Sequence, residues 1–368
     1  MSEERAWQRI VRGEIRSRAD RVMEAGLRAL AGMYGLALRA HLGAYRWGLA
    51  RRTRLEARVI SLGNLTVGGT GKTTSCLAVA RYLRQQGERV AVLSRGYRGE
   101  GEGGARIVSR GAGPIVSVQE AGDEPYLMAR ALPEVSVLVG RDRRRTGALA
   151  VEELGATALV LDDGFQYQRL ERDLDIVLVD ALLPFGYDFL VPRGLLREPV
   201  SHLERTDAVW LTHCDLVRGS DLEAIRARVK QVAPRARVWE ARHAPVGLRS
   251  LSGEMRYEPE ALHGIKVCAL SSLGNPAAFE RALERLGAEV IPARFPDHHP
   301  YTAGEVQAVA QREDGAEWIV TTEKDAVRLP AEALAKPVWV LEVALAGRPD
   351  GPSLAEEMEC LLKATDKR

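Results

Sequence analysis

The sequence predicts an α/β fold in which a parallel sheet is flanked by helices, with a second, smaller α/β lobe and an N-terminal amphipathic helical segment. From Arg58 onward, short β-branched runs alternate with longer helical patterns, which is typical of parallel strands joined by helices. These runs are almost continuously apolar, as strands covered on both faces must be. The alternation pauses around Pro245 and then resumes, which indicates the second lobe.

The expected elements follow in chain order. A strand over 57–63 leads into a glycine-rich turn and then a helix from Lys72 to Gln86. Further core strands are expected at 89–96, 135–140, 156–164, 174–180 and 207–213. The second lobe supplies strands at 266–274, 288–295, 317–325 and 336–344. This pattern predicts three parts, with boundaries at 1–56 for the N-terminal segment, 57–240 for the core and 241–368 for the second lobe.

The composition is that of a folded protein with room for two domains. The chain has 368 residues, of which 46% are hydrophobic and 28% charged. Its net charge of +2 is too small to indicate nucleic acid as a partner, and no obligate protein partner is inferred. The cysteines lie far apart with no C-x-x-C pair, so neither a zinc site nor a disulfide framework is indicated; they are Cys76, Cys214, Cys268 and Cys360.

The N-terminal segment is basic and amphipathic. Between Gly26 and Leu55 there are six arginines and no acidic residue. No uncharged run reaches the roughly 18 to 20 apolar residues that a membrane span needs, and no cleavable signal pattern is present. Apolar residues at helical spacing suit a helix lying in the interface of an anionic membrane; they are Leu27, Leu30, Met33, Tyr34 and Leu38. A helix that packs on its own domain explains the same pattern, so both interpretations remain open.

The turn after the first predicted strand reads TVGGTGKTT, from Thr66 to Thr74. A strand, a glycine-rich turn and Gly-Lys-Thr opening a helix place backbone N–H groups around a phosphate, as in a P-loop NTPase. Lys72 is then expected to reach the β and γ phosphates of ATP, and the Thr73 hydroxyl to bind Mg²⁺. The residues expected to contact ATP are Gly68, Gly69, Thr70, Gly71, Lys72, Thr73 and Thr74.

Thr66 stands where the usual loop has its first glycine. The segment instead resembles the loop of the deviant Walker ATPases of the partition and nitrogenase-reductase type. Their extra lysine is replaced here by Val67, which weakens the hypothesis of a partner-regulated ATPase switch. That switch remains the alternative function.

Acidic and histidine residues at loop positions supply further candidates. Asp162 and Asp163 follow an apolar run and suit Mg²⁺, because two adjacent carboxylates need a compensating cation. Asp123 and Glu124 lie at a predicted helix start, where helix capping alone also explains them. The loop FPDHHPY contains His298 and His299, which suit acid–base or hydrogen-bonding chemistry as well as metal binding. Arg95, Arg197 and Glu198 add charged groups at other loops.

Several motifs occurring in order give the chain a family resemblance. The segments are GNLTVGGTGKTT, LSRGYRG, GDEP, VLDDGFQ, RGLLREP, FPDHHPY and TTEKDAVRL. Together they resemble the tetraacyldisaccharide 4′-kinase family, from about Val59 to Leu329. The resemblance implies ATP-dependent phosphorylation of the 4′-hydroxyl of tetraacyldisaccharide 1-phosphate, the lipid A disaccharide precursor, to give lipid IVA. It also implies a peripheral location on the cytoplasmic face of the bacterial inner membrane, contacted by the N-terminal helix.

The resemblance also implies roles for individual residues. Asp123 is expected to be the base for the sugar hydroxyl, with His298 supporting it and His299 as the less favoured choice. Lys72 is expected to neutralise charge during transfer, while Thr73, Asp162 and Asp163 serve Mg²⁺. The residues expected to line the site are Arg95, Glu124, Gln166, Arg197 and Glu198.

One position departs from the family pattern. The paired aspartates are usually followed by G-F-Q-H, but here the last residue is Tyr167. A phenol lacks the near-neutral proton chemistry of histidine, so either the role of that histidine is absent here or hydrogen bonding by the tyrosine hydroxyl replaces it.

A third hypothesis is a soluble ATP-dependent ligase or small-molecule kinase with the same loop. It predicts that the segment before Arg51 is dispensable, whereas the lipid kinase needs that segment.

Overall fold

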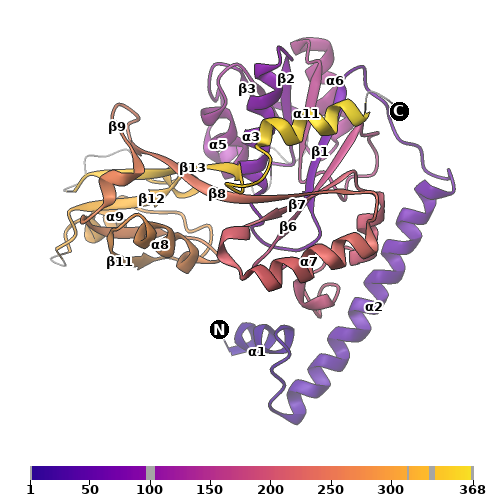
Figure 1. Cartoon of the computed structure of the whole chain (residues 1–368), viewed down its shortest axis with the longest axis horizontal. Helices are drawn as coiled ribbons and strands as arrows, with labels where there is room; N and C mark the ends of the chain where they lie inside the picture. Colours follow the sequence, from indigo (N-terminus) through magenta and orange to yellow (C-terminus); the bar gives the residue numbers. More distant parts are fainter. Residues whose placement is uncertain (1, 97–103, 313–314, 331–335, 366–368) are drawn as a thin grey trace. The chain divides into compact units, whose positions relative to one another are not determined.

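The computed structural model describes residues 2–96, 104–312, 315–330 and 336–365. The chain forms two compact units (Figure 1). Unit 1 comprises Met1–Arg95, Asp142–Arg242 and Ala346–Arg368, and unit 2 comprises Gly96–Arg141 and His243–Leu345.

Unit 1 is built from a parallel sheet and its covering helices. The sheet order is β8-β7-β6-β1-β5-β2, and every neighbouring pair among these strands is parallel. The strands are β1 (Arg58–Asn64), β2 (Val90–Ser94), β5 (Ala158–Asp162), β6 (Leu174–Asp180), β7 (Ala208–Thr212) and the first part of β8 (Arg237–Ser250). The helices are α1 (Ser2–Val11), α2 (Arg18–Arg46), α3 (Lys72–Gln85), α6 (Arg143–Leu154), α7 (Gly219–Val232) and α11 (Leu354–Thr365).

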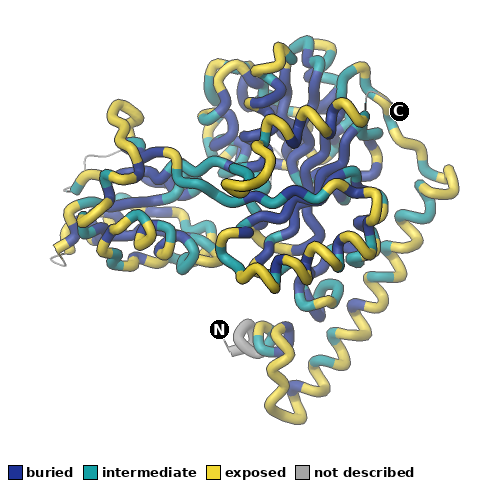
Figure 2. Tube along the Cα trace, viewed as in Figure 1, coloured by how far each residue is buried: buried dark blue, intermediate teal, exposed yellow. Residues whose placement is uncertain are grey.

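Helices cover both faces of this sheet, which explains why its strands are apolar throughout. Helix α3 packs on β1, β2 and β5, and α11 packs on α3 and β6. Figure 1 shows α7 on the opposite side of β6 and β7. Strands β1, β2, β5, β6 and β7 are accordingly buried along almost their whole length (Figure 2), whereas β8 at the edge of this unit's sheet is only partly buried.

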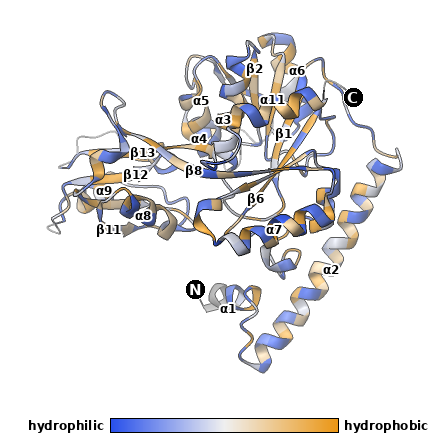
Figure 3. Ribbon diagram, in the orientation of Figure 1, coloured by the Kyte–Doolittle hydropathy of each residue, from blue (hydrophilic) through white to orange (hydrophobic). Residues whose placement is uncertain are grey.

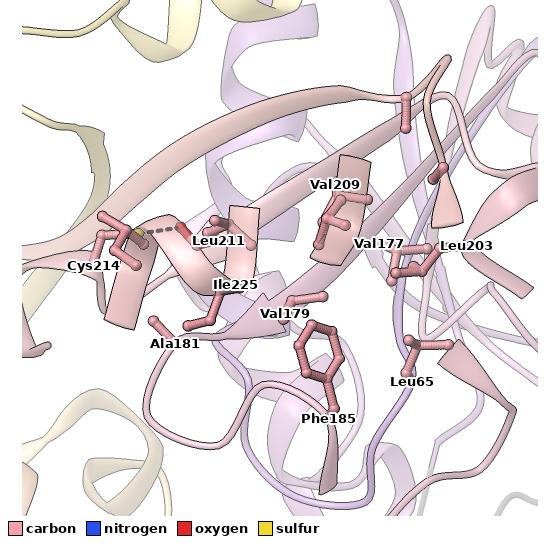
Figure 4. Close-up of a cluster of buried hydrophobic side chains, with 14 of the residues drawn as sticks. Leu65, Val177, Val179, Ala181, Phe185, Leu203, Val209, Leu211, Cys214 and Ile225 are labelled. Carbon is pink, nitrogen blue, oxygen red and sulfur yellow. Dashed lines mark hydrogen bonds between the residues drawn. The ribbon is translucent and has the colours of Figure 1, made fainter. Parts of the chain in front are cut away.

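The core beneath α7 extends to the start of the phosphate loop. Val177 and Val179 of β6 and Val209 of β7 pack with Ile225 of α7 in one buried cluster (Figure 4). Leu65, the first residue after β1, belongs to the same cluster and is 1% exposed. The loop that follows Leu65 is therefore anchored in the core at its first residue.

Unit 2 contains a second parallel sheet and two antiparallel pairs of strands, one of which joins β9 to the end of β8. The parallel strands lie in the order β11-β10-β12-β13, and β3 pairs antiparallel with β4. The strands are β3 (Arg106–Arg110), β4 (Ser136–Val139), β9 (Arg256–Tyr257), β10 (Lys266–Ser271), β11 (Glu289–Arg294), β12 (Trp318–Thr322) and most of β13 (Val338–Gly347). The helices are α4 (Val118–Ala121), α5 (Asp123–Ala131), α8 (Pro276–Arg285), α9 (Ala303–Ala310) and α10 (Glu323–Ala326).

The units divide the chain differently from the three ranges expected from sequence. The change near residue 242 lies close to the expected boundary at 240, but residues 96–141 group with unit 2 and residues 346–368 with unit 1. The reason is that hydrophobic periodicity predicts the type of an element but not the sheet or core that it joins. Helix α11, for example, packs on α3, which lies far from it in sequence.

Helix α2 presents two different faces. Ala31 is buried, and Tyr34 and Gly35 contact the loop that precedes β7: the Tyr34 hydroxyl donates to the Arg197 carbonyl at 2.8 Å, and a Cβ at Gly35 would lie 3.1 Å from Leu190. Val22 and Met33, in contrast, are 74% and 66% exposed. Figure 3 shows hydrophobic and hydrophilic residues alternating along this helix. Of the five residues predicted to share one apolar face, Leu30 and Met33 thus point to solvent while Leu27 and Leu38 are partly covered.

Candidate active site

The phosphate loop joins β1 to α3 and bends through glycines. Gly68 and Gly71 have φ values of 122° and 81°, a region that residues with a Cβ seldom adopt. Helix α3 begins at Lys72, directly after Gly71. The first N–H groups of a helix have no intrahelical partner and carry its positive dipole end. The turn and helix start therefore form an anion-binding cradle, with Gly68 and Gly69 exposed.

Two polar side chains that sequence reasoning missed hold this loop. Asn64, the last residue of β1, donates from Nδ2 to the Thr70 hydroxyl at 3.0 Å. Thr212, the last residue of β7, donates from its hydroxyl to the Thr70 carbonyl at 3.2 Å. The sequence did contain a signal for these two residues. Both end apolar strands, and the carboxyl ends of these strands meet at one edge of the sheet.

Asp162 ends β5, beside the strand that carries the loop. It is 3% exposed, and its Oδ2 accepts a hydrogen bond from the Ser94 hydroxyl at 2.7 Å. The Cys76 thiol of α3 lies 3.7 Å from Oδ1. This carboxylate is therefore held in one orientation at the start of the helix that follows the phosphate loop.

Asp163 is surrounded by cations. Arg197 donates two hydrogen bonds to its carboxylate, at 2.8 and 2.7 Å, and the Lys72 ammonium lies 3.6 Å from Oδ1. Burial would raise the pKa of Asp163, but these contacts and the nearby Arg143 outweigh it and hold that pKa well below its usual range. The carboxylate thus stays ionised and holds the catalytic lysine candidate in place.

Gln166, Arg197 and Glu198 lie together beside Asn64. Gln166 donates from Nε2 to the Asn64 carbonyl at 3.1 Å and to Glu198 at 3.2 Å. Burial would raise the pKa of Glu198, but hydrogen bonds and charge from His202 and Arg205 outweigh it and lower that pKa. Glu198 is fully buried and supports the loop that carries Arg197. Arg95, another predicted site residue, follows β2 directly and is exposed.

The second group of site residues lies within unit 2. Asp123 is the first residue of α5, and its Oδ2 lies 3.1 Å from Nδ1 of His298. His298 Nε2 lies 3.2 Å from the Lys324 ammonium, which can only donate. Nε2 is therefore the acceptor, and the imidazole proton is on Nδ1, from which it is donated to Asp123. Of the two candidate histidines, His298 is the one that contacts Asp123.

His299 has a different set of partners. Its Nε2 lies 3.1 Å from both carboxylate oxygens of Glu305, and its ring stacks on Phe295 with centroids 4.9 Å apart. His299 therefore fixes the loop that also carries His298.

Sequence reasoning also missed the cations around Asp123. Arg328 Nε lies 3.5 Å from the Asp123 carboxylate, and Lys324 lies 3.7 Å from Glu124. Burial would raise the pKa of Asp123, but the hydrogen bond from His298 and the charges of Arg328 and Lys324 outweigh it and lower that pKa. Both cations belong to the quoted segment TTEKDAVRL, and its charged residues were the available signal. Lys324 falls in the range 317–325 that was expected to be a strand, but the strand ends at Thr322 and α10 begins at Glu323.

Arg328 is itself positioned by Asp325, a carboxylate with no exposed surface. Asp325 accepts hydrogen bonds from Arg328 at 2.6 Å, from the Ser272 hydroxyl at 2.6 Å and from the Thr322 hydroxyl at 2.8 Å. The buried carboxylate thus ties α10 to the loop after β10.

We expect Asp325→Ala to destabilise the protein by about 3–5 kcal/mol, because it removes the closest carboxylate from the buried Arg328 charge and leaves the Ser272 and Thr322 hydroxyls without their acceptor. Urea unfolding followed by circular dichroism measures the change. Glu254→Ala, at an exposed carboxylate of the same unit, is the control and should change stability by about 0.5 kcal/mol or less. Equal stabilities for the two variants would contradict this role of Asp325.

The structure thus assembles the predicted residues into two groups, each inside its own unit. Unit 1 holds the loop Gly68 to Thr74, both paired aspartates and the residues around Arg197; unit 2 holds Asp123, Glu124 and the two histidines.

A parallel sheet with a phosphate loop at the end of one strand, and a pair of aspartates at the end of the strand beside it, defines a P-loop nucleotide-binding protein. Residues 23–363 match the family model described as Tetraacyldisaccharide-1-P 4'-kinase. The chain therefore belongs to the tetraacyldisaccharide 4′-kinase family.

Individual relatives agree with this assignment. A tetraacyldisaccharide 4'-kinase of Anaeromyxobacter dehalogenans is 52% identical over 318 residues, covering 85% of this chain and 81% of the relative. One from Geobacter sulfurreducens is 39% identical over 351 residues, covering 95% and 96%. A crystal structure of LpxK from Aquifex aeolicus in complex with ATP superposes with a TM-score of 0.74 at 30% identity, covering 93% of this chain and 99% of that one.

Within the described ranges of the chain, no helix has the length and apolar character needed to span a membrane.

Proposed function

We propose that this protein transfers the γ-phosphoryl group of ATP to the 4′-hydroxyl of tetraacyldisaccharide 1-phosphate. The observation that carries the proposal is the Asp123–His298 pair, in which a partly buried carboxylate is oriented by a hydrogen bond from the imidazole. Such a carboxylate suits proton removal from a sugar hydroxyl. A switch ATPase, the alternative hypothesis, has no need of an acceptor base, and the family assignment does not favour it.

ATP is assigned to the loop of unit 1. The backbone of Gly68 to Thr74 would cradle the phosphates, and Lys72, held beside Asp163 at 3.6 Å, would neutralise charge as the γ-phosphoryl group moves. Most of the rate in such a transfer comes from positioning and charge neutralisation. Arg197 is placed to hold Asp163 while Lys72 turns to the nucleotide.

The residues present fit Mg²⁺. This ion prefers oxygen ligands and is usually held by one or two carboxylates together with phosphate oxygens. The buried Asp162 carboxylate and the Thr73 hydroxyl at the start of α3 suit that donor set, with Asp163 as the second charge. When bound, Mg²⁺ would neutralise negative charge on the phosphates.

The acceptor is assigned to Asp123. The lowered pKa of Asp123 makes it a weak base toward a free hydroxyl. In a loose phosphoryl transfer, however, the hydroxyl becomes acidic only as its bond to phosphorus forms, so a weak base that accepts the proton late is sufficient. His298 would keep the accepting oxygen oriented, and Glu124 and Lys324 would complete the polar surroundings of the base.

The deciding experiment incubates the protein with ATP, Mg²⁺ and tetraacyldisaccharide 1-phosphate and measures product mass. A gain of one phosphate on the lipid is expected. ATP hydrolysis without a phosphorylated lipid would contradict the kinase proposal and support the switch. Phosphorylation of a soluble sugar in place of the lipid would support the small-molecule kinase.

We further propose that α2 binds the surface of an anionic membrane, which for this substrate is the cytoplasmic face of the bacterial inner membrane. Arg21, Arg28, Arg39 and Arg46 follow one another at spacings of 7, 11 and 7 residues and so lie along one side of the helix. Next to this row, Val22, Met33 and Leu36 are 74%, 66% and 65% exposed. A row of cations beside an apolar stripe suits the interface of anionic lipids.

Replacing Val22, Met33 and Leu36 together by glutamate should lower binding to vesicles containing anionic phospholipid by more than about tenfold, because each apolar side chain contributes about 1.5–3 kcal/mol when buried. Sedimentation with the vesicles measures the binding. The control adds the same three charges to the exposed face of α7, at Ala224, Ala227 and Gln231. If this control lost binding equally, or the α2 variant kept it, the membrane role of α2 would be wrong.

A further inference from the structure

We propose that Tyr167 is a positioning residue. It holds the buried guanidinium of Arg143 against the turn that contains Asp162 and Asp163, and it thereby sets the affinity for ATP. The inference rests on the proposed function, whose site it deepens. It concerns the position at which this chain departs from the family motif.

Arg143 is a buried cation with few hydrogen bonds. It is the first residue of α6 and is 6% exposed. Its Nη2 donates to the Asp162 carbonyl at 3.4 Å, and its Nε has no hydrogen-bond partner in the part of the chain that the structure describes. A long hydrogen bond and an unsatisfied nitrogen do not by themselves hold a guanidinium in place. Another contact must fix this side chain.

The ring of Tyr167 supplies that contact. The Arg143 Cζ lies 5.3 Å from the ring centroid, within the range of a cation–π interaction. Tyr167 is bound at its other end to the turn, because its N–H donates to the Gly164 carbonyl at 2.9 Å. Gly164 is itself close to β1, where a Cβ would lie 2.6 Å from the Ser61 hydroxyl. The tyrosine is therefore carried by a segment that cannot shift far.

The hydroxyl of Tyr167 binds Asp142, the residue before Arg143. It donates to Oδ1 of Asp142 at 2.7 Å. Asp142 is the N-cap of α6 and also accepts from the Arg144 backbone N–H at 3.1 Å. Tyr167 thus touches two successive residues at the start of α6, the cap through its hydroxyl and Arg143 through its ring, and it joins this helix start to the aspartate turn.

The consequence for the site is electrostatic. Arg143 lies near both aspartates, and its charge adds to those of Arg197 and Lys72 in keeping the pKa of Asp163 low. If Arg143 turned away, Lys72 would be held more tightly by Asp163 and would be less available to the phosphates. We therefore expect the position of Arg143 to affect ATP binding more than acceptor binding.

A phenol and an imidazole differ at this position in their response to pH. The groups that face Tyr167 are Asp142, Arg144 and Arg143. Burial and the hydrogen bond to Asp142 raise the pKa of Tyr167, so it stays neutral near neutral pH. A histidine there would gain a second positive charge beside Arg143 as the pH falls, and repulsion would displace the guanidinium.

The test uses the full-length chain with Tyr167→Phe, Tyr167→Ala and Tyr167→His, and Tyr257→Phe as a matched control at an exposed tyrosine. Calorimetry measures the Kd for ATP with Mg²⁺, and steady-state kinetics give the KM for ATP and for the lipid acceptor. We expect Tyr167→Ala to weaken ATP binding about tenfold with an unchanged KM for the acceptor, and Tyr167→Phe, which keeps the ring, about threefold. Tyr167→His should match the wild type at pH 8 and lose ATP affinity between about pH 7 and 6 relative to it.

Wild-type Kd values in Tyr167→Ala and Tyr167→Phe would overturn the proposal, and so would equal losses in both substrates' KM values. If Tyr167→Ala fails to fold, Tyr167→Phe and Tyr167→His decide. The Kd measurement needs no acceptor, so it tests the positioning role even if the wild type transfers no phosphate to the lipid, which would count against the proposed function alone.

Discussion

Asp123→Asn should lower kcat by about 10²- to 10⁴-fold, the range expected when a general base is removed. The amide cannot take the proton of the sugar hydroxyl, yet it keeps the size of the carboxylate and can still hydrogen-bond to His298. The Kd for ATP should stay within about twofold of the wild type, because Asp123 is assigned to the acceptor and not to the nucleotide. Lipid product formation, followed by mass spectrometry, measures the loss.

The Asp123→Asn variant should also differ from the wild type in how its stability depends on pH. The pKa of Asp123 is lower in the folded protein than its usual value, so the unfolded chain binds the proton more tightly. Its ionised form therefore stabilises the fold at pH values above the ordinary aspartate pKa, and this contribution is lost as the pH falls through the lowered pKa. Asp123→Asn should flatten this acid limb of the stability curve, measured by urea unfolding from pH 5 down to about pH 2.

Glu124→Gln is the matched control, since Glu124 neighbours Asp123 and reaches Lys324 only at 3.7 Å. We expect it to lower kcat by much less than Asp123→Asn. Wild-type turnover in Asp123→Asn would make the base assignment wrong, whatever happened to stability.

Lys72→Met should lower kcat by about 10²- to 10³-fold, the loss expected when a charge that stabilises the transition state is removed. Methionine keeps most of the length of the side chain but leaves Asp163 with Arg197 as its close cation, so the phosphates lose their nearest positive charge. The ATP dependence of product formation measures the effect and separates kcat from KM.

Lys363→Met, at a lysine 69% exposed on α11, controls for loss of a charge in the same unit and should leave kcat unchanged. A Lys72→Met enzyme with wild-type kcat would show that the loop binds nucleotide without taking part in transfer.

Much of the unit 1 group of residues was predictable because these residues are close in sequence. Strand, glycine turn and helix follow one another from Arg58 to Gln85 as predicted, and Asp162 ends its strand as predicted. The supports of the loop, Asn64 and Thr212, were missed. They come from strands whose order in the sheet depends on packing, which local patterns do not report.

The unit 2 group was predictable only in part. The resemblance pointed to Asp123 and His298, but the surrounding cations Lys324 and Arg328 come from a turn far along the chain. Helix α2 gave a similar result: its helical character follows from residue spacing, whereas which of its faces is exposed depends on the contacts of Ala31 and Gly35 with the rest of unit 1.

The sequence by itself determined the α/β fold, the phosphate loop, the paired aspartates and the family, because each depends on residues near one another or on motifs that keep their order. Only the tertiary structure decided that His298, and not His299, meets Asp123 across 175 residues of sequence, and that Tyr167 reaches the start of α6. These contacts depend on how separate segments pack, and packing is set by the burial of whole elements together. The residues of the phosphate loop can therefore be recognised from local sequence, whereas the orientation of Asp123, the proposed base, depends on the folded chain.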